Sequence, residues 1–340
     1  MNEVAIEKSS SPPKAEVARP AFGRPLTVLR FFANSRELTL LVLILLLGAG
    51  MTIVYPDNFP TKYNFSAVLL NAAQNSILVT GMMLLMIGGA FDLSIGSTLA
   101  LSGVMAAVAS VWWGLPPLAS FLVGIATGAV AGLVNGFIVT RVQINALITT
   151  LATMAIYRGG TQLISGTGIM SIGDSFKAYG QSVYFGLQSP FWVALVVVLV
   201  GWWAVAKTRF FRQYYFIGGN ARAAQLSGIR VGRLTLVGFV IMGALAGLAG
   251  VLAAARLNSA VISAGTGVEL SVITAAVLGG ASLRGGEGSI IGGVLGVMLI
   301  ALVQNALIIN GVGVFWQNII VGFVLLLAVS LDRFKQTHRG

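Results

Sequence analysis

Long apolar stretches separated by short polar ones dominate the chain from residue 38 onwards. A helix needs about 20 mostly apolar residues to cross the roughly 30 Å hydrocarbon layer of a bilayer. The pattern therefore predicts an all-α polytopic membrane protein with about ten transmembrane helices. These helices are expected at residues 38–55, 66–87, 93–112, 117–140, 144–164, 190–206, 234–255, 268–281, 288–309 and 314–331. The segment 268–281 is short for a full crossing, and the one after Asp92 is a candidate for a partly re-entrant segment.

Composition supports a membrane protein, because 56% of the residues are hydrophobic, 9% are charged and the mean hydropathy is +0.90. A water-soluble domain does not have this composition. The absence of cysteine excludes disulfides, thiolate metal sites and thiol catalysis, and the single histidine is His338, near the end of the chain. The formal charge of +11 suggests nucleic-acid binding, but the positions of the basic residues indicate membrane topology instead.

Basic residues give an independent test of the ten predicted helices. With the N-terminus inside, 17 Lys and Arg fall on cytoplasmic segments and 4 on the opposite side. The positive-inside rule expects such a bias. We therefore predict that both termini are cytoplasmic. The expected organisation is a basic N-terminal tail (1–37), a transmembrane domain (38–333) that contains a long cytoplasmic loop (207–233), and a short C-terminal tail (334–340).

Glycine spacing predicts how the helices pack. Glycines recur at every fourth residue in three segments, at Gly124, Gly128, Gly132 and Gly136, at Gly243 and Gly247, and at Gly288, Gly292 and Gly296. Such faces let helix backbones approach closely, either in static packing or in helices that slide or rock. A weak internal echo also relates residues 88–90 to 279–281 and residues 133–135 to 302–304, which suggests two weakly repeated halves of the kind common in transporters.

A polar island lies between two apolar segments, at residues 218–229. Six basic residues surround it. Asn220 is suited to cap the start of a helix, and Gly228 is suited to the left-handed conformation that ends one. The island therefore predicts about two helical turns over residues 221–227, which form a compact docking surface.

Uncharged amides occur at membrane depth in several predicted helices. Asn71, Gln74 and Asn75 share one helix face because they are spaced at i, i+3 and i+4. Further amides of this kind are Asn135, Gln304 and Asn305. Amides offer donors and acceptors without charge. They suit a pathway for a sugar or polyol, or equally hydrogen bonds that hold helices together.

Asp92 is the clearest charged candidate, since it lies between two apolar helices within Gly88–Ser97. An acid within the membrane indicates function, and we place Asp92 and the nearby Ser94 in the pathway or its gate. The alternative is that Asp92 caps the helix that begins near Leu93 and complements its dipole. The sequence leaves both interpretations open.

Catalytic motifs are missing from the chain. No lysine lies in a Gly-Lys-Ser/Thr phosphate loop, and no Gly-x-Gly-x-x-Gly or His-Glu-x-x-His motif occurs. We expect no catalytic residue, no metal site and no cofactor in this chain, and no nucleic-acid partner. Ion-coupled transport normally needs several acids or bases deep in the membrane, and only Asp92 is placed for such a role.

Three blocks of sequence resemble the signature blocks of bacterial ABC sugar permeases of the ribose, xylose, arabinose and galactoside type. The blocks are Phe91–Ser97, Gly219–Ile229 and Val277–Gly288. The resemblance covers nearly all of residues 38–333. It implies a multi-pass permease in the bacterial cytoplasmic (inner) membrane that imports a monosaccharide or polyol by alternating access.

The resemblance also implies partners for the chain. These are a second permease copy, identical or a sister subunit, a cytoplasmic ABC ATPase that binds the ATP, a periplasmic sugar-binding protein and membrane lipid. The residues that resemble the coupling helix are Gly219, Asn220, Arg222, Ala223, Ala224, Gly228 and Ile229. The alternatives are a permease for branched-chain amino acids or other small polar solutes, and an ion-coupled secondary transporter.

Overall fold

The computed structural model describes residues 36–313, 315–317, 319–324, 326 and 330. All of the elements described below belong to one unit, residues 36–340. Almost all of the predicted N-terminal tail (1–37) and the whole C-terminal tail (334–340) lie outside the described residues. Much of the tenth predicted membrane helix (314–331) also falls there.

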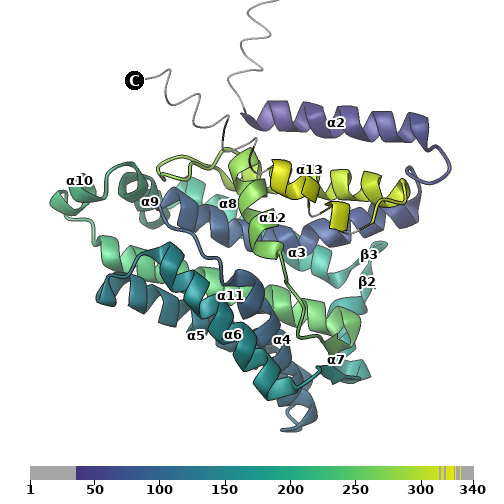
Figure 1. Cartoon of the computed structure of the whole chain (residues 1–340), viewed down its shortest axis with the longest axis horizontal. Helices are drawn as coiled ribbons and strands as arrows, with labels where there is room; N and C mark the ends of the chain where they lie inside the picture. The colour runs from purple at the N-terminus through teal and green to yellow at the C-terminus, as the bar shows by residue number, and fades with distance from the viewer. Residues whose placement is uncertain (1–35, 314, 318, 325, 327–329, 331–340) are drawn as a thin grey trace, which may run out of the picture. The chain divides into compact units, whose positions relative to one another are not determined.

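Helices make up nearly all of the regular structure (Figure 1). In the first half of the chain they are α2 (Arg36–Val54), α3 (Lys62–Ile87), α4 (Ile95–Val111), α5 (Pro117–Phe137) with a π-helical turn η1 (Ile138–Val142), and α6 (Ala146–Ser165). In the second half they are α7 (Asp174–Gln181), α8 (Ser189–Lys207), α9 (Arg209–Gly219), α10 (Ala221–Leu226), α11 (Val231–Leu257), α12 (Val268–Leu278) and α13 (Ile290–Ile309).

Four two-residue strands form small antiparallel pairs outside the helices. β1 (Ile169–Met170) pairs with β4 (Ser259–Ala260), and β2 (Val183–Tyr184) pairs with β3 (Leu187–Gln188). These pairs only fasten loops, so the prediction of a mostly helical protein is confirmed.

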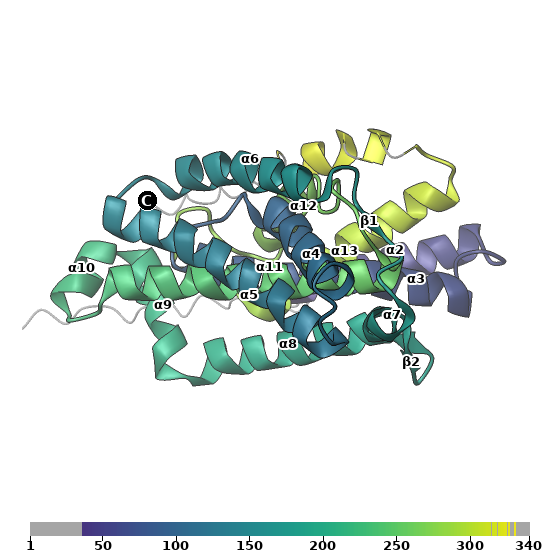
Figure 2. The same ribbon diagram turned by 90° about the horizontal axis from the view of Figure 1, so that it is seen from below.

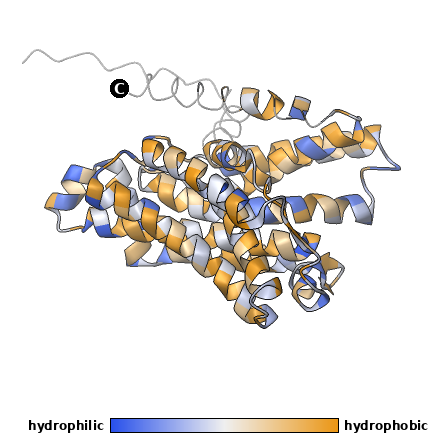
Figure 3. Cartoon of the chain, turned by 60° about the horizontal axis from the view of Figure 1, so that its bottom comes forward, coloured by the Kyte–Doolittle hydropathy of each residue, from blue (hydrophilic) through white to orange (hydrophobic). Residues whose placement is uncertain are grey.

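The first nine predicted membrane segments each coincide with a helix. Six helices within the described part of the chain are long and apolar enough to span a bilayer: α2, α3, α5 with η1, α8, α11 and α13. The helices α4 and α12 are apolar but shorter. Figure 3 shows that hydrophobic residues dominate the long helices.

The core forms around α3 and α11. Most side chains from Ser76 to Ile87 are buried, and α11 packs against α3, α4 and α5 (Figures 1 and 2). The predicted glycine faces explain the close packing: a β-carbon on Gly132 would overlap the carbonyl oxygen of Phe239, and one on Gly243 would overlap that of Gly128. Backbones therefore touch directly between α5 and α11.

The helix α12 is too short to cross the membrane alone. Its 11 residues span only about 16 Å, roughly half of the hydrocarbon thickness. An irregular segment, residues 261–267, precedes it. Carbonyls of such a segment need partners at membrane depth. Arg158 on α6 supplies them, because its Nη1 donates to the carbonyl oxygens of Ile262 at 2.6 Å and Ala264 at 2.9 Å.

The two Gly-Gly-Ala sequences that echo each other end their helices in the same way. At the end of α3, the amides of Gly89 and Ala90 donate to the carbonyls of Met86 and Leu85. At the end of α12, Gly280 and Ala281 donate to Val277 and Ala276. The second glycine of each pair has a positive φ, +79° and +99°, which glycine adopts without strain.

Candidate functional site

The predicted polar island is folded as the short helix α10 between α9 and α11. The side chain of Asn220 accepts the amide of Ala223 at 3.0 Å, so it is the N-cap. Gly228 has φ +85°. The amides of Gly228 and Ile229 donate to the carbonyls of Gln225 and Ala224, which completes a Schellman motif. The predicted caps are confirmed, and the helix ends at Leu226, one residue earlier than expected.

One face of α10 is exposed and the other is held by the chain itself. Arg222, Gln225 and Leu226 are exposed, with Leu226 80% accessible. Ala224 is only 4% exposed and packs in the core, with Ile229 against it. The outward surface therefore consists of the neighbours of Ala224 and not of Ala224 itself.

Tyr214 fastens α9 to the start of α11. Its hydroxyl donates to the carbonyl oxygen of Leu234 at 2.6 Å, and its side chain is 1% exposed. Burial raises the pKa of Tyr214 above the usual value for tyrosine, so the hydroxyl remains a donor at neutral pH. The neighbouring Tyr215 donates to the carbonyl of Gly288 at 2.8 Å. These two bonds hold α9 against two different parts of the bundle.

Glycines allow a second, direct contact at the end of α9. A β-carbon on Gly218 would overlap the carbonyl oxygen of Ile87 and the amide nitrogen of Gly286. The amide of Gly286 also donates to the carbonyl of Ile87 at 2.9 Å. The end of α9, the end of α3 and the loop before α13 thus meet backbone to backbone. We call this contact the glycine junction, formed by Gly218, Ile87, Gly285 and Gly286.

A half-open polar cavity of about 620 Å³ lies beside the middle of α3. Small-molecule sites have volumes of about 300–1,000 Å³. Four of the predicted pathway residues line it: Asn71, Gln74, Asn75 and Gln304. The prediction that the three amides of α3 share one face is confirmed.

The cavity also contains polar residues that the sequence analysis did not select, namely Arg256, Thr266 and Ser271. Arg256 follows directly after the predicted membrane helix 234–255, and in the structure it lies in the last turn of α11. Its position in an otherwise apolar helix was the signal that could have identified it. Thr266 and Ser271 gave no such signal, because their approach to α3 depends on the course of the irregular segment before α12.

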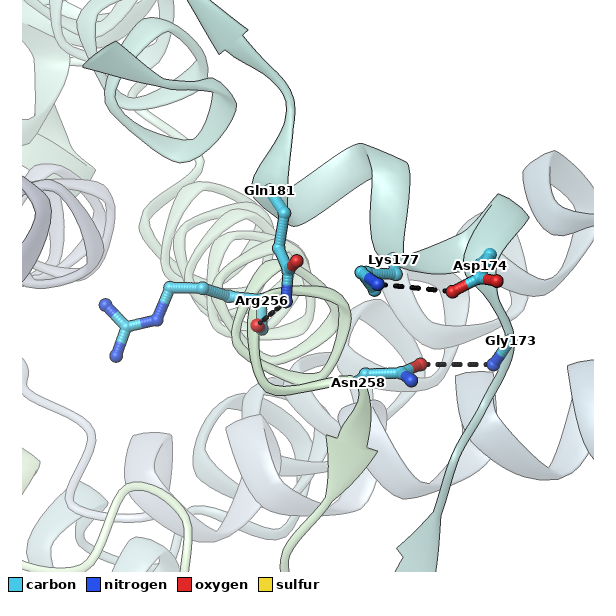
Figure 4. A network of polar contacts seen from close by, with 6 residues as sticks. All are labelled: Gly173, Asp174, Lys177, Gln181, Arg256 and Asn258. Atoms are coloured by element: carbon cyan, nitrogen blue, oxygen red, sulfur yellow. Dashed lines mark hydrogen bonds and ion pairs between the residues drawn. The ribbon is translucent and has the colours of Figure 1, made fainter. Parts of the chain in front are cut away.

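The backbone of Arg256 is fixed by a hydrogen bond, and its side chain points away from that bond. Figure 4 shows that Gln181 donates to the carbonyl oxygen of Arg256, at 2.6 Å, while the guanidinium extends away from this contact. The nearby Asp174 pairs with Lys177 at 3.2 Å. Within the described part of the chain, the Arg256 guanidinium makes neither an ion pair nor a hydrogen bond. It is therefore a cation available to the cavity.

Asp92, Ser94 and Asn135 lie apart from the cavity in a buried polar cluster. One carboxylate oxygen of Asp92 accepts the amide of Ser94 at 2.7 Å and its hydroxyl at 2.6 Å. The other oxygen accepts from Nδ2 of Asn135 at 3.3 Å. Tyr157 donates in turn to the amide oxygen of Asn135 at 3.2 Å. The cluster joins the loop after α3 to α5 and α6.

The capping interpretation of Asp92 gains one supporting bond, from the amide of Ser94, but the start of the helix differs from the prediction. The helix α4 begins at Ile95 rather than near Leu93, and its N-cap is Ser94. Asp92 satisfies the amide of Ser94 and none in the first turn of the helix. The carboxylate instead orients a segment before the helix, and it is 2% exposed.

Asn305 differs from its neighbour Gln304 in its surroundings. Its amide pairs reciprocally with that of Asn64 on α3, at 2.6 and 3.1 Å. It is absent from the residues that line the cavity. Its geometry is that of interhelical hydrogen bonding, the alternative that the sequence left open for all of these amides.

Comparisons with known proteins agree on the class. The sequence model of the family described as "Branched-chain amino acid transport system / permease component" matches residues 64–329. The chain is 37% identical over 314 residues to the ribose import permease protein RbsC of Escherichia coli K12, covering 90% of this chain and 97% of that protein. No solved structure matches it.

Two further relatives extend the likeness. The L-arabinose transport system permease protein AraH of Escherichia coli K12 is 36% identical over 327 residues, covering 95% of this chain and 98% of that protein. The ribose import permease protein RbsC of Bacillus subtilis is 36% identical over 281 residues, with coverage of 82% and 87%. Long apolar helices and relatives of this kind define a polytopic membrane permease. The chain belongs to the family of branched-chain amino acid transport system permease components, and the resemblance to sugar permeases found in three sequence blocks is confirmed.

Proposed function

We propose that the chain is the membrane-spanning permease subunit of an ATP-driven ABC importer for a monosaccharide, located in the bacterial cytoplasmic (inner) membrane. The ribose and arabinose import permeases among its relatives support this class of substrate. The chain has no phosphate-binding loop. A cytoplasmic ABC ATPase therefore supplies ATP hydrolysis, a second permease copy completes the membrane part, and a periplasmic sugar-binding protein delivers the sugar.

The observation that carries this proposal is the course of α3. Its last residue, Ile87, belongs to the glycine junction, where it meets the end of α9. Its middle presents Asn71, Gln74 and Asn75 to the polar cavity. About 18 Å of rigid helix separates Asn75 from Ile87 at 1.5 Å per residue. One buried helix thus connects the exposed docking surface to the polar cavity, so displacement of α10 is passed to the cavity wall.

In this proposal, α10 is the coupling helix that contacts the ATPase. Gly219, Asn220, Arg222 and Ala223 are exposed and available for that contact. The remaining members of the predicted set have supporting roles. Gly228 shapes the end of the helix, while Ala224 and Ile229 hold it on its own bundle. Closure of the ATPase dimer around ATP then moves α10, and the two permease copies rock between outward-open and inward-open states.

The polar residues divide into two groups. Asn71, Gln74, Asn75 and Gln304 line the pathway, because they reach the cavity. Asp92, Ser94 and Asn135 position the loop between α3 and α4, beside the glycine junction, and Asn305 holds α13 to α3. Since the loop follows directly from Ile87, the Asp92 cluster affects gating through the junction and does not contact sugar.

The family description also names branched-chain amino acids, and the cavity chemistry decides between the two substrates. A zwitterionic amino acid carries an ammonium group that a buried site pairs with a carboxylate. The lining of the cavity offers amides, hydroxyls and Arg256, with no carboxylate. It suits hydroxyl groups, which both donate and accept hydrogen bonds.

The proposed topology has ten membrane crossings and both termini in the cytoplasm. Six crossings correspond to the long apolar helices. The short α12 crosses together with the irregular segment 261–267, in which Arg158 binds the carbonyls of Ile262 and Ala264. The distribution of 17 basic residues on one side and 4 on the other supports this orientation.

Reconstitution tests the proposed function. The chain is combined with its ATPase and binding protein in vesicles, and uptake of D-ribose, L-arabinose and L-leucine is followed with and without ATP. ATP-dependent accumulation of a sugar and not of leucine is expected. Accumulation driven by a proton or sodium gradient in vesicles without an ATPase contradicts the proposal.

A further inference from the structure

Five polar side chains around the cavity have no partner within the described part of the chain. They are Asn71, Gln74, Asn75, Gln304 and Arg256, and their side chains make no hydrogen bond with a described residue. Other amides in the same bundle differ, since Asn64 pairs with Asn305 and Asn135 bonds to Asp92 and Ser94. These five side chains are partly or fully accessible and not buried, so they are free to bind water or a polar solute. Their convergence on one space indicates that the space holds a polar solute.

The chemistry of the five groups limits what that solute is. A guanidinium offers only donors, whereas each amide offers two donors and an acceptor. A phosphate or carboxylate accepts hydrogen bonds only, so it would leave the four amide oxygens unpaired. A hydroxyl-rich neutral molecule pairs with both kinds of group. Neighbouring hydroxyls of a sugar ring also fit the fixed fork of an arginine.

The cavity lies far from the coupling helix along α11. Tyr214 fixes α9 at Leu234, near the start of α11, and Arg256 lies at its other end. Arg256 lies 22 positions after Leu234, which corresponds to about 33 Å of helix, or about the thickness of the hydrocarbon layer. If α10 faces the cytoplasm, the Arg256 end of the cavity faces the periplasm, where a binding protein delivers sugar.

We propose that this cavity is the outward-side resting site for one monosaccharide and that Arg256 donates to a pair of its hydroxyls. The proposal rests on the proposed function as a sugar permease. The proposal adds a sugar-binding residue and a location to that function. Sugar released by the binding protein occupies the space between α3 and the end of α11 before the permease changes conformation. Because the cavity is half-open and polar, it holds sugar weakly and does not trap it.

The test compares D-ribose with its 2-deoxy, 3-deoxy and 5-deoxy analogues in the complete reconstituted importer. Uptake is measured at saturating concentrations of loaded binding protein. Arg256→Gln is expected to slow ribose uptake about tenfold, as for loss of one charge-assisted hydrogen bond. At least one deoxy analogue, lacking one of the hydroxyls that Arg256 binds, is expected to show a smaller difference between the wild type and the variant than ribose does.

Two more variants separate recognition from folding. Gln304→Met changes a cavity residue on a different helix and keeps a side chain of similar shape. The factor by which it slows uptake is also expected to differ between ribose and its deoxy analogues. Arg158→Gln is the matched arginine control, because its guanidinium already binds two carbonyls and lies outside the cavity lining. This variant is expected to slow all sugars by the same factor.

The outcomes distinguish the two proposals. If Arg256→Gln leaves ribose uptake unchanged, or slows every analogue equally, the resting site is wrong while the permease function stands. If the effect of Arg256→Gln needs phosphatidylglycerol in the vesicles and ignores the sugar hydroxyls, a lipid headgroup binds Arg256 and the proposal is also wrong. If the wild type accumulates no monosaccharide in the presence of ATP, the proposed function itself fails.

Discussion

Gly218 and Gly285 touch backbone to backbone, since a β-carbon on Gly285 would lie 2.8 Å from the α-carbon of Gly218. Any side chain at either position would separate α9 from the loop before α13. The contact also includes Gly89, whose α-carbon lies equally close to that position. Three segments far apart in the sequence are therefore in direct backbone contact at the base of α10, so we expect a displacement of one to be passed to the others. Side-chain contacts, which can adjust by changing rotamer, would transmit such a displacement less directly.

Replacement of Gly228 tests the coupling helix. Gly228→Pro cannot adopt φ +85°, and it removes the amide that donates to Gln225, so the end of α10 is disrupted. ATP hydrolysis stimulated by loaded binding protein is expected to fall by at least about tenfold, equivalent to about 1.4 kcal/mol. Ser227→Ala is the control, because the Ser227 hydroxyl bonds only within α10, to Ala223. Unchanged stimulation in the proline variant would place the ATPase contact elsewhere.

The absence of cysteine allows topology to be tested with single-cysteine variants. Gln225→Cys lies on the exposed face of α10 and is expected to react with a membrane-impermeant maleimide only from the cytoplasmic side. Asp174→Cys is the matched position on the opposite side, with a side chain that is 92% exposed. It is expected to react in intact cells. Labelling of both cysteines from the same side would overturn the proposed orientation.

Local features were predictable from the sequence because local rules govern them. Asn220 and Gly228 lie eight positions apart and cap the short helix between them. Because such caps depend only on neighbouring residues, both were identified correctly from the sequence. The spacing of Asn71, Gln74 and Asn75 placed them on one face without any knowledge of the bundle. Apolar length located the helices for the same reason.

Contacts between distant segments were not predictable in this way. Gln304 and Asn305 are adjacent amides with the same chemistry, yet one faces the cavity and the other binds Asn64. Their roles follow from the rotation of α13 against α3, which no local pattern encodes. The burial of Ala224 was not predictable for a related reason, because α10 rests on a core that is assembled from other helices.

Substitution of Asp92 distinguishes positioning from a role for its charge. In Asp92→Asn, the amide oxygen can still accept both bonds from Ser94, but the new NH₂ group faces Nδ2 of Asn135. Two donors then oppose each other, and stability is expected to fall by about 1–3 kcal/mol. Sugar uptake per folded molecule is expected to stay close to that of the wild type. The measurements are thermal unfolding in detergent and uptake normalised to the folded fraction.

A second variant controls for the hydrogen bonds of Asp92. Asp92→Leu removes the acceptor for the amide and hydroxyl of Ser94 and for one bond from Asn135, so it is expected to be less stable than Asp92→Asn. If Asp92→Asn folds as stably as the wild type but does not transport, the negative charge itself takes part in the transport cycle. That result would support a position for Asp92 in the transport pathway.

Glycine-to-alanine changes test whether the contact between α5 and α11 must remain close. In Gly132→Ala the new methyl group would overlap the carbonyl of Phe239, and neither backbone can move without disturbing the adjacent pair, Gly128 and Gly243. Overpacking of this kind is expected to cost about 1–3 kcal/mol. Gly160→Ala on α6 is the matched control, since no atom lies within 4 Å of the new carbon. Unfolding temperatures of the two variants give the comparison, and equal values would show that α5 and α11 separate easily, as sliding helices do.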